Sequence, residues 1–199
     1  MPKPNHEGNV WPHGTLTDID IDIDVDVDIL AVEAEIRMPV MQISRRMTVA
    51  RPPGGRLGIW SAVALDETAE VEPVDTPSPD VGDPDVEFAA VPGTRNEEGA
   101  LWVGRSGRTT RLLNNIIENL RHPPGFGAWV LSMTGPAGDE AQVPKAVVRL
   151  IAKDKAAALG AQLLQWSEKS DLGHIIVSHG ETIESDPREV LRNLAKALL

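Results

Sequence analysis

A histidine at the end of a predicted strand is the residue of this sequence best placed to do chemistry. His179 follows the apolar, β-branched run at residues 174–177 and is followed directly by Gly180. Such a run, bounded by a glycine, predicts a buried strand that ends in a tight turn. Strands of α/β proteins often deliver an imidazole to their carboxyl end as a metal ligand or a base. The alternative is a histidine that only caps the turn.

Six aspartates alternate with Ile or Val near the N-terminus. A period of two predicts a strand with one carboxylate face and one aliphatic face. A row of carboxylates could collect hard cations such as Ca²⁺ or Mg²⁺. The alternatives are a solvated edge strand whose charges resist edge-to-edge pairing and a simple expansion of a short repeat. The six residues of this possible cation tract are Asp18, Asp20, Asp22, Asp24, Asp26 and Asp28.

The elements that must position these residues are read from periodicity and turn signals. Residues 1–16 contain three prolines and two glycines and predict a flexible tail. Residues 17–199 are expected to form one α/β domain. Its first part reads as an antiparallel meander, with strands at 31–40, 45–50 and 56–65. Residues 66–85 mix prolines with acidic residues, lack Lys and Arg, and predict an acidic linker or surface loop.

The second half of the chain alternates strands with helices. Strands are predicted at 86–91, 100–103 and 108–113, and residues 114–120 read as a short helix or a strand exit. Helical spacing begins at Val143 and predicts two helices with a break near Lys153, the second capped by Asp154. A last helix is predicted after Asp186, with Pro187 as its first residue and Glu189 completing a capping box.

Composition excludes several classes of function. The 199 residues include no cysteine, so disulfides, thiolate metal sites and cysteine catalysis are excluded. No apolar run approaches the ~18 residues of a membrane span, and the N-terminus lacks the apolar core of a signal peptide. A cytoplasmic protein is therefore expected. The formal net charge of −11 argues against nucleic acid and anionic membranes as partners.

Three blocks of the chain resemble the metallo-β-lactamase superfamily, in an uncharacterised bacterial branch. They are RMTVARPPGGRLGIWSAVALDE (46–67), GRTTRLLNNIIENLRHPPGFGAWVLSMTG (107–135) and IIVSHGETIESDPREVLRNL (175–194), together 71 of the 199 residues. The resemblance implies a reduced αββα sandwich, with the N-terminal meander and the C-terminal helices as its parts. It also implies a dinuclear metal site at the mouths of two facing sheets.

The resemblance assigns two metal ligands and lacks the others. His179 falls on the last histidine of the family pattern, and Asn115 falls where an aspartate is expected. A neutral amide cannot bridge two cations as a carboxylate does. The His-rich motif has no counterpart, because the acidic linker stands in its place. Zinc or another divalent metal is implied only if the site survives.

Two classes of function follow. The first is a metallo-hydrolase-like protein with a degenerate metal site and weak or no activity. The second is an acidic, non-catalytic binding or interaction module, cation-responsive through the aspartate tract. A shortened relative without a selected function is a third reading. The sequence assigns no catalytic residue, and it leaves the small-molecule substrate or protein partner unknown.

Overall fold

The N-terminal part of the chain forms an antiparallel sheet. The computed structural model describes residues 17–18, 29–38, 41–50, 58–60, 83–94, 98–105, 107–120, 140–145, 147–152 and 155–199. The first sheet consists of β1 (Thr17–Asp18), β2 (Ile29–Met38), β3 (Met41–Ala50) and β4 (Gly58–Trp60), in that order. Each strand pairs antiparallel with the next, which confirms the predicted meander.

Several predictions fall outside the described residues. These are the tail at 1–16, residues 66–82 of the acidic linker, and the five aspartates at positions 20–28. Asp18 is the one member of the aspartate tract that the structure describes, and it ends β1, a strand of two residues. The long carboxylate-faced strand therefore stays a prediction.

A second sheet follows, and it contains the predicted histidine strand. Its members are β5 (Val86–Ala90), β6 (Gly99–Arg105), β7 (Arg108–Leu113) and β8 (Leu172–Val177), in that order. The first three pair antiparallel as consecutive strands, whereas β8 pairs parallel to β7. A parallel partner needs a crossover connection. The helical residues between β7 and β8 belong to that connection.

The described helices are a π-helix, η1 (Val147–Ala152), and two α-helices, α2 (Ala156–Ser167) and α3 (Pro187–Leu198). Two helical segments on either side of residue 153 are as predicted, although the first has π geometry. Residue 154 lies outside the described residues, and the residue that precedes α2 is Lys155. None of the described helices has the length and apolar character needed to cross a membrane.

The capping box predicted for α3 does not form. Asp186 is the N-cap and Pro187 is the first helical residue, as predicted, but the Asp186 side chain makes no capping hydrogen bond. The reason is its left-handed backbone, with φ of 52°, because a capping side chain needs extended backbone to reach the first-turn N–H groups. Glu189 instead pairs with Arg192 at 2.8 Å.

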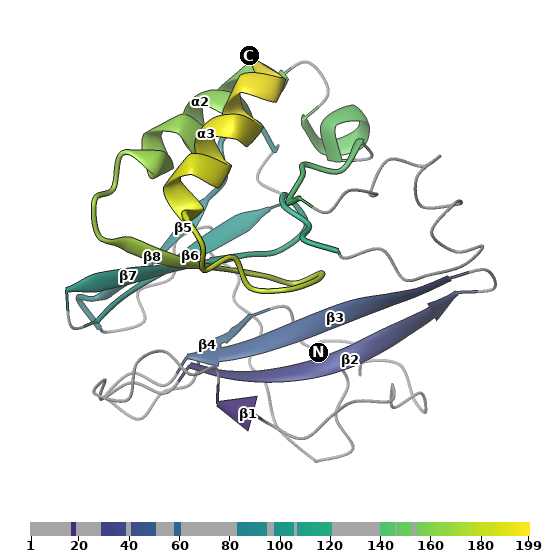
Figure 1. Ribbon diagram of the computed structural model, residues 1–199, viewed down its shortest axis with the longest axis vertical. Coiled ribbons are helices and arrows are strands. Elements are labelled where there is room, and N and C mark those ends of the chain that lie inside the picture. Colours follow the sequence, from purple (N-terminus) through teal and green to yellow (C-terminus); the bar gives the residue numbers. More distant parts are fainter. Residues whose placement is uncertain are drawn as a thin grey trace, which may run out of the picture.

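The elements stack as helices on sheet on sheet, a mixed α/β arrangement (Figure 1). Both faces of the β5–β8 sheet contribute apolar residues to the core. Ile175 and Val177 pack with α2 and α3 in the larger core cluster, whereas Ile176 between them packs with Ile29 of β2 in the smaller one. This alternation places every second residue of β8 under the helices. A backbone hydrogen bond of 2.7 Å from Arg46 N–H to the Ser178 carbonyl oxygen also joins β3 to the end of β8.

The segment after β7 is a strand exit and not a helix. Within it, Glu118 bridges to Gln142 and Asn119 bridges to Gly180. Asn119 N–H donates to the His179 carbonyl oxygen, and the Glu181 N–H donates back to Asn119 at 3.0 Å in both cases. The turn after β8 is therefore fixed against residues 114–120.

Gly180 is where this turn tolerates least change. Its φ is 101°, and an added methyl group would lie 2.1 Å from the Asn119 carbonyl oxygen. We expect Gly180→Ala to lower the free energy of unfolding by about 3 kcal/mol or more, because backbone strain and a steric clash add. Chemical denaturation measures this. Gly104→Ala is the control, since its added carbon would meet the Asp85 carbonyl oxygen at 3.6 Å, an ordinary contact. Equal losses in the two variants would contradict the close packing at Gly180.

Candidate functional site

The two residues assigned as metal ligands, His179 and Asn115, lie in contact. In the parallel pairing of β7 and β8, Leu113 stands opposite Val177. Each ligand candidate lies two positions beyond one of these partners, so both continue the same register past the strand ends. Nε2 of His179 lies 3.2 Å from Oδ1 of Asn115. The two side chains therefore converge beyond the carboxyl end of β8.

A buried carboxylate, Glu98, extends this pair to three residues. Glu98 is 5% exposed and accepts a 2.9 Å hydrogen bond from Nδ2 of Asn115 and a longer one from the Asn115 backbone N–H. It lies two residues before Ala100, the partner of Leu113, and so continues the β6–β7 register opposite Asn115. We call Glu98, Asn115 and His179 the polar row. Glu98 was not predicted as a site residue, because it lies between the strands predicted at 86–91 and 100–103.

The polar row does not fit a metal centre. The amide oxygen of Asn115 can only accept, so Nε2 of His179 donates its proton in their contact and has no lone pair for a cation there. The amide nitrogen of Asn115 already donates to Glu98. In the part of the chain that the structure describes, no group of three or more His, Asp or Glu is arranged to hold a metal ion. His6, His13 and His122 lie outside that part.

A second row of side chains crosses the sheet four residues earlier on β7. Cross-strand pairing sets Glu87 opposite Trp102 and Trp102 opposite Arg111. Directly paired residues of a sheet share one face. That face lies under the helices, because Trp102 meets Trp166 of α2 edge to face, with ring centroids 6.2 Å apart and the rings at 90°.

The guanidinium of Arg111 sits in the corner between these two indoles. Its Cζ lies 3.5 Å from the Trp102 ring centroid and 3.7 Å from that of Trp166. The side chain is 0% exposed, and its Nε and Nη1 are buried without a hydrogen-bond partner in the part of the chain that the structure describes. Burial lowers the pKa of Arg111 to about 8, and the attraction of Glu87 opposes that shift. The cation is stacked on both indoles but not neutralised.

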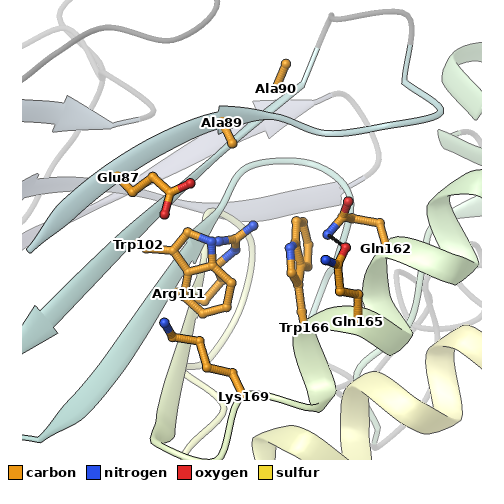
Figure 2. A pocket seen from close by; sticks show the side chains of 9 residues that line it. All are labelled: Glu87, Ala89, Ala90, Trp102, Arg111, Gln162, Gln165, Trp166 and Lys169. Atoms are coloured by element: carbon orange, nitrogen blue, oxygen red, sulfur yellow. Dashed lines mark hydrogen bonds between the residues drawn. The ribbon is translucent and has the colours of Figure 1, made fainter.

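A cavity of about 380 Å³ opens beside this stack, between the sheet and α2 (Figure 2). Its size falls in the range of small-molecule sites. Lys169 lies at its edge, with Nζ 5.0 Å from the Trp102 ring centroid. Gln162 and Gln165 hydrogen-bond to each other at 3.1 Å on the helix side. The lining consists of Glu87, Ala89, Ala90, Trp102, Arg111, Gln162, Gln165, Trp166 and Lys169.

Comparisons with known proteins do not place the chain in a family. No family model matches it, and no curated protein matches it. The resemblance to the metallo-β-lactamase superfamily therefore stays a prediction from the sequence blocks.

The cavity was not predicted from the sequence, although the position of Arg111 in β7 gives a local indication of it. In the β7 sequence RTTRLL, Arg111 lies two residues before Leu113 and two after Thr109, so all three share one face. Leu113 and Thr109 are both buried. An arginine on the buried face of a strand is rare unless it is paired. The partners of Arg111 come from β6 and α2, which the local pattern does not name.

Glu118, next to the polar row in sequence, makes stability depend on pH. Its Oε2 is buried without a partner among the described residues, and burial raises the pKa of its carboxyl to about 7. The folded state therefore binds more protons than the unfolded state between about pH 4.5 and pH 7. The free energy of unfolding should fall as pH rises through this interval. Denaturant titrations at several pH values should show that the free energy of unfolding depends less on pH in Glu118→Gln than in the wild type. The exposed control Glu184→Gln should keep the wild-type pH dependence. An equal pH dependence in all three proteins would refute the assignment.

Proposed function

We propose that this protein is a binding domain for a small organic anion, which it holds in the cavity beside Arg111. The observation that carries the proposal is Arg111, which lines that cavity and whose Nε and Nη1 have no hydrogen-bond partner among the described residues. Both donors are covered in this structure, so an anion reaches them only when the surrounding side chains move. The proposed function belongs to the second class of function expected from the sequence, a non-catalytic binding module.

The free-energy cost of burying the charge of Arg111 favours the binding of an anionic ligand beside it. Removing a charge from water costs several kcal/mol in real proteins unless it is paired. Stacking on an aromatic ring returns about 0.5–2 kcal/mol for each ring. Two indoles therefore offset part of this cost but do not satisfy the donors of Arg111. A carboxylate would satisfy them, since it can accept two parallel hydrogen bonds from a guanidinium.

The rest of the cavity suits an organic body. Trp102 and Trp166 supply apolar walls at right angles, and rings that line such walls favour flat or apolar groups. Lys169 adds a second cation at the edge. Two cations against the single charge of Glu87 make the cavity locally positive in a chain of net charge −11.

Calorimetric titration with indole-3-propionate tests the proposal. We expect binding to the wild type and a loss of about 10- to 100-fold in affinity for Arg111→Met, the range that a buried charge-assisted hydrogen bond supplies. Stability without ligand should be unchanged or higher in Arg111→Met, because the variant removes an unneutralised buried charge.

The control is Arg149→Met, which removes a positive charge from the exposed surface of η1. It should bind indole-3-propionate as the wild type does. A wild type that binds no organic carboxylate would contradict the proposal. So would an Arg111→Met variant that unfolds easily but binds normally, since Arg111 would then be a structural stack only.

A second candidate is the metallo-hydrolase-like protein predicted from the sequence, in a reduced metallo-β-lactamase-like sandwich with a degenerate metal site. The contact of His179 with Asn115 favours it, because the family pattern requires residues at these two positions to converge. Two stacked sheets with helices over one of them correspond to part of such an αββα sandwich, since the described helices cover one outer face. The polar row does not fit a metal, so this candidate has weak activity or none.

Asn115→Asp tests this ancestry. The change would set a second carboxylate against Glu98, whose Oε1 lies 2.9 Å from the Asn115 amide nitrogen. We expect it to lower stability by about 1–3 kcal/mol at neutral pH, through a lost hydrogen bond and like-charge repulsion. Zinc should restore that loss by binding between the carboxylates and His179. Thermal unfolding with and without zinc measures both effects. No rescue, or an equal rescue in Asn115→Asp/His179→Ala, would remove this candidate.

A further inference from the structure

We infer that the ligand of the cavity is a zwitterion, an α-amino acid with a large apolar side chain, whose ammonium group binds Glu87 while its carboxylate binds Arg111. This inference rests on the proposed function and names the class of ligand.

Glu87 is placed to receive a cation from the ligand. It lines the cavity and lies in the same row of the sheet as Arg111, with Trp102 between them. Adjacent strands are about 4.8 Å apart, so the two Cα atoms are separated by about 10 Å. No ion pair or hydrogen bond joins Glu87 to Arg111, although both side chains are described. Each end of a small zwitterion would therefore meet an opposite charge across this gap.

The charges around Trp102 give the ligand an orientation. Figure 2 shows Glu87 on one side of the Trp102 indole and Lys169 on the other. Arg111 and Lys169 place their cationic groups 3.5 Å and 5.0 Å from the centroid of that indole. The carboxylate of the ligand is directed to these two cations, and the ammonium group is directed to Glu87. The side chain then lies against Trp166 and the helix wall.

Glu87 also acts against competing ligands. Glu87 is exposed, so water solvates its charge, and a plain carboxylate bound to Arg111 lacks only the ion pair that an ammonium group would form with Glu87. A dicarboxylate is repelled directly. A plain amine meets Arg111 and Lys169, which repel it. Only a molecule with both charges satisfies the two ends of the row, so the row selects by charge pattern as well as by shape.

The test uses three related indoles that differ in their charged groups: L-tryptophan, indole-3-propionate and tryptamine. Calorimetry on the full chain should show L-tryptophan binding about tenfold tighter than indole-3-propionate, with tryptamine weakest. In Glu87→Gln the preference should shrink to about threefold or less, because indole-3-propionate gains and L-tryptophan loses affinity. Glu184→Gln, an exposed acid far along the chain from the row, should keep the wild-type preference.

The outcomes separate the two proposals. Equal binding of L-tryptophan and indole-3-propionate would overturn the zwitterion and leave the anion site standing. A preference that survives in Glu87→Gln would overturn the role of Glu87. Failure of both carboxylates to bind, or tightest binding of tryptamine, would overturn the proposed function itself. Glu87 is exposed, and thermal unfolding of Glu87→Gln should confirm that the variant is folded.

Discussion

The parallel pairing of β7 with β8 is the constraint on which both sites depend. It joins residues 64 positions apart, which sets Arg111 beside Ile175 and, two steps beyond Leu113 and Val177, Asn115 beside His179. A parallel pair cannot be closed by a hairpin, so the chain must cross over the sheet between the two strands. The crossover carries α2, which brings Trp166 onto the face that holds Arg111. The pairing of β7 with β8 thus brings the polar row together and requires the crossover whose helix α2 covers the cavity.

The energetics of the two sites differ in kind. In the polar row each described side-chain contact has a donor matched to an acceptor, from His179 through Asn115 to Glu98. Such a row stabilises the turn after β8 and leaves little drive to bind. In the cavity the charge of Arg111 is stacked but not neutralised. The buried charge of Arg111 would be stabilised by an anionic ligand. The proposed function is therefore assigned to the cavity and not to the predicted histidine.

Local patterns predicted most of the elements but not the contacts between them. Strict alternation and turn residues located the strands of both sheets, since these signals act within a few residues. The same kind of signal correctly predicted Asp186 as the N-cap of α3, but the predicted capping hydrogen bonds do not form. The Asp-Pro pair does not reveal that the backbone of Asp186 is left-handed. The π geometry of η1 was likewise not predicted. His179 and Asn115 were paired through the family resemblance, whereas Arg111 needed two partners from distant elements. Register across β6, β7 and α2 decides its surroundings, and no local period reports that register.

A row of apolar residues lies between the two sites and affects how each site responds to substitutions in the other. Ala100, Leu113 and Val177 are each buried and separate Arg111 from the polar row. Arg111 and Asn115 are four residues apart on one strand path, which is about 13 Å. Sites at this separation with no shared partner respond to substitution additively. The two rows therefore behave as independent modules on one sheet, and either can be lost or rebuilt while the other is conserved.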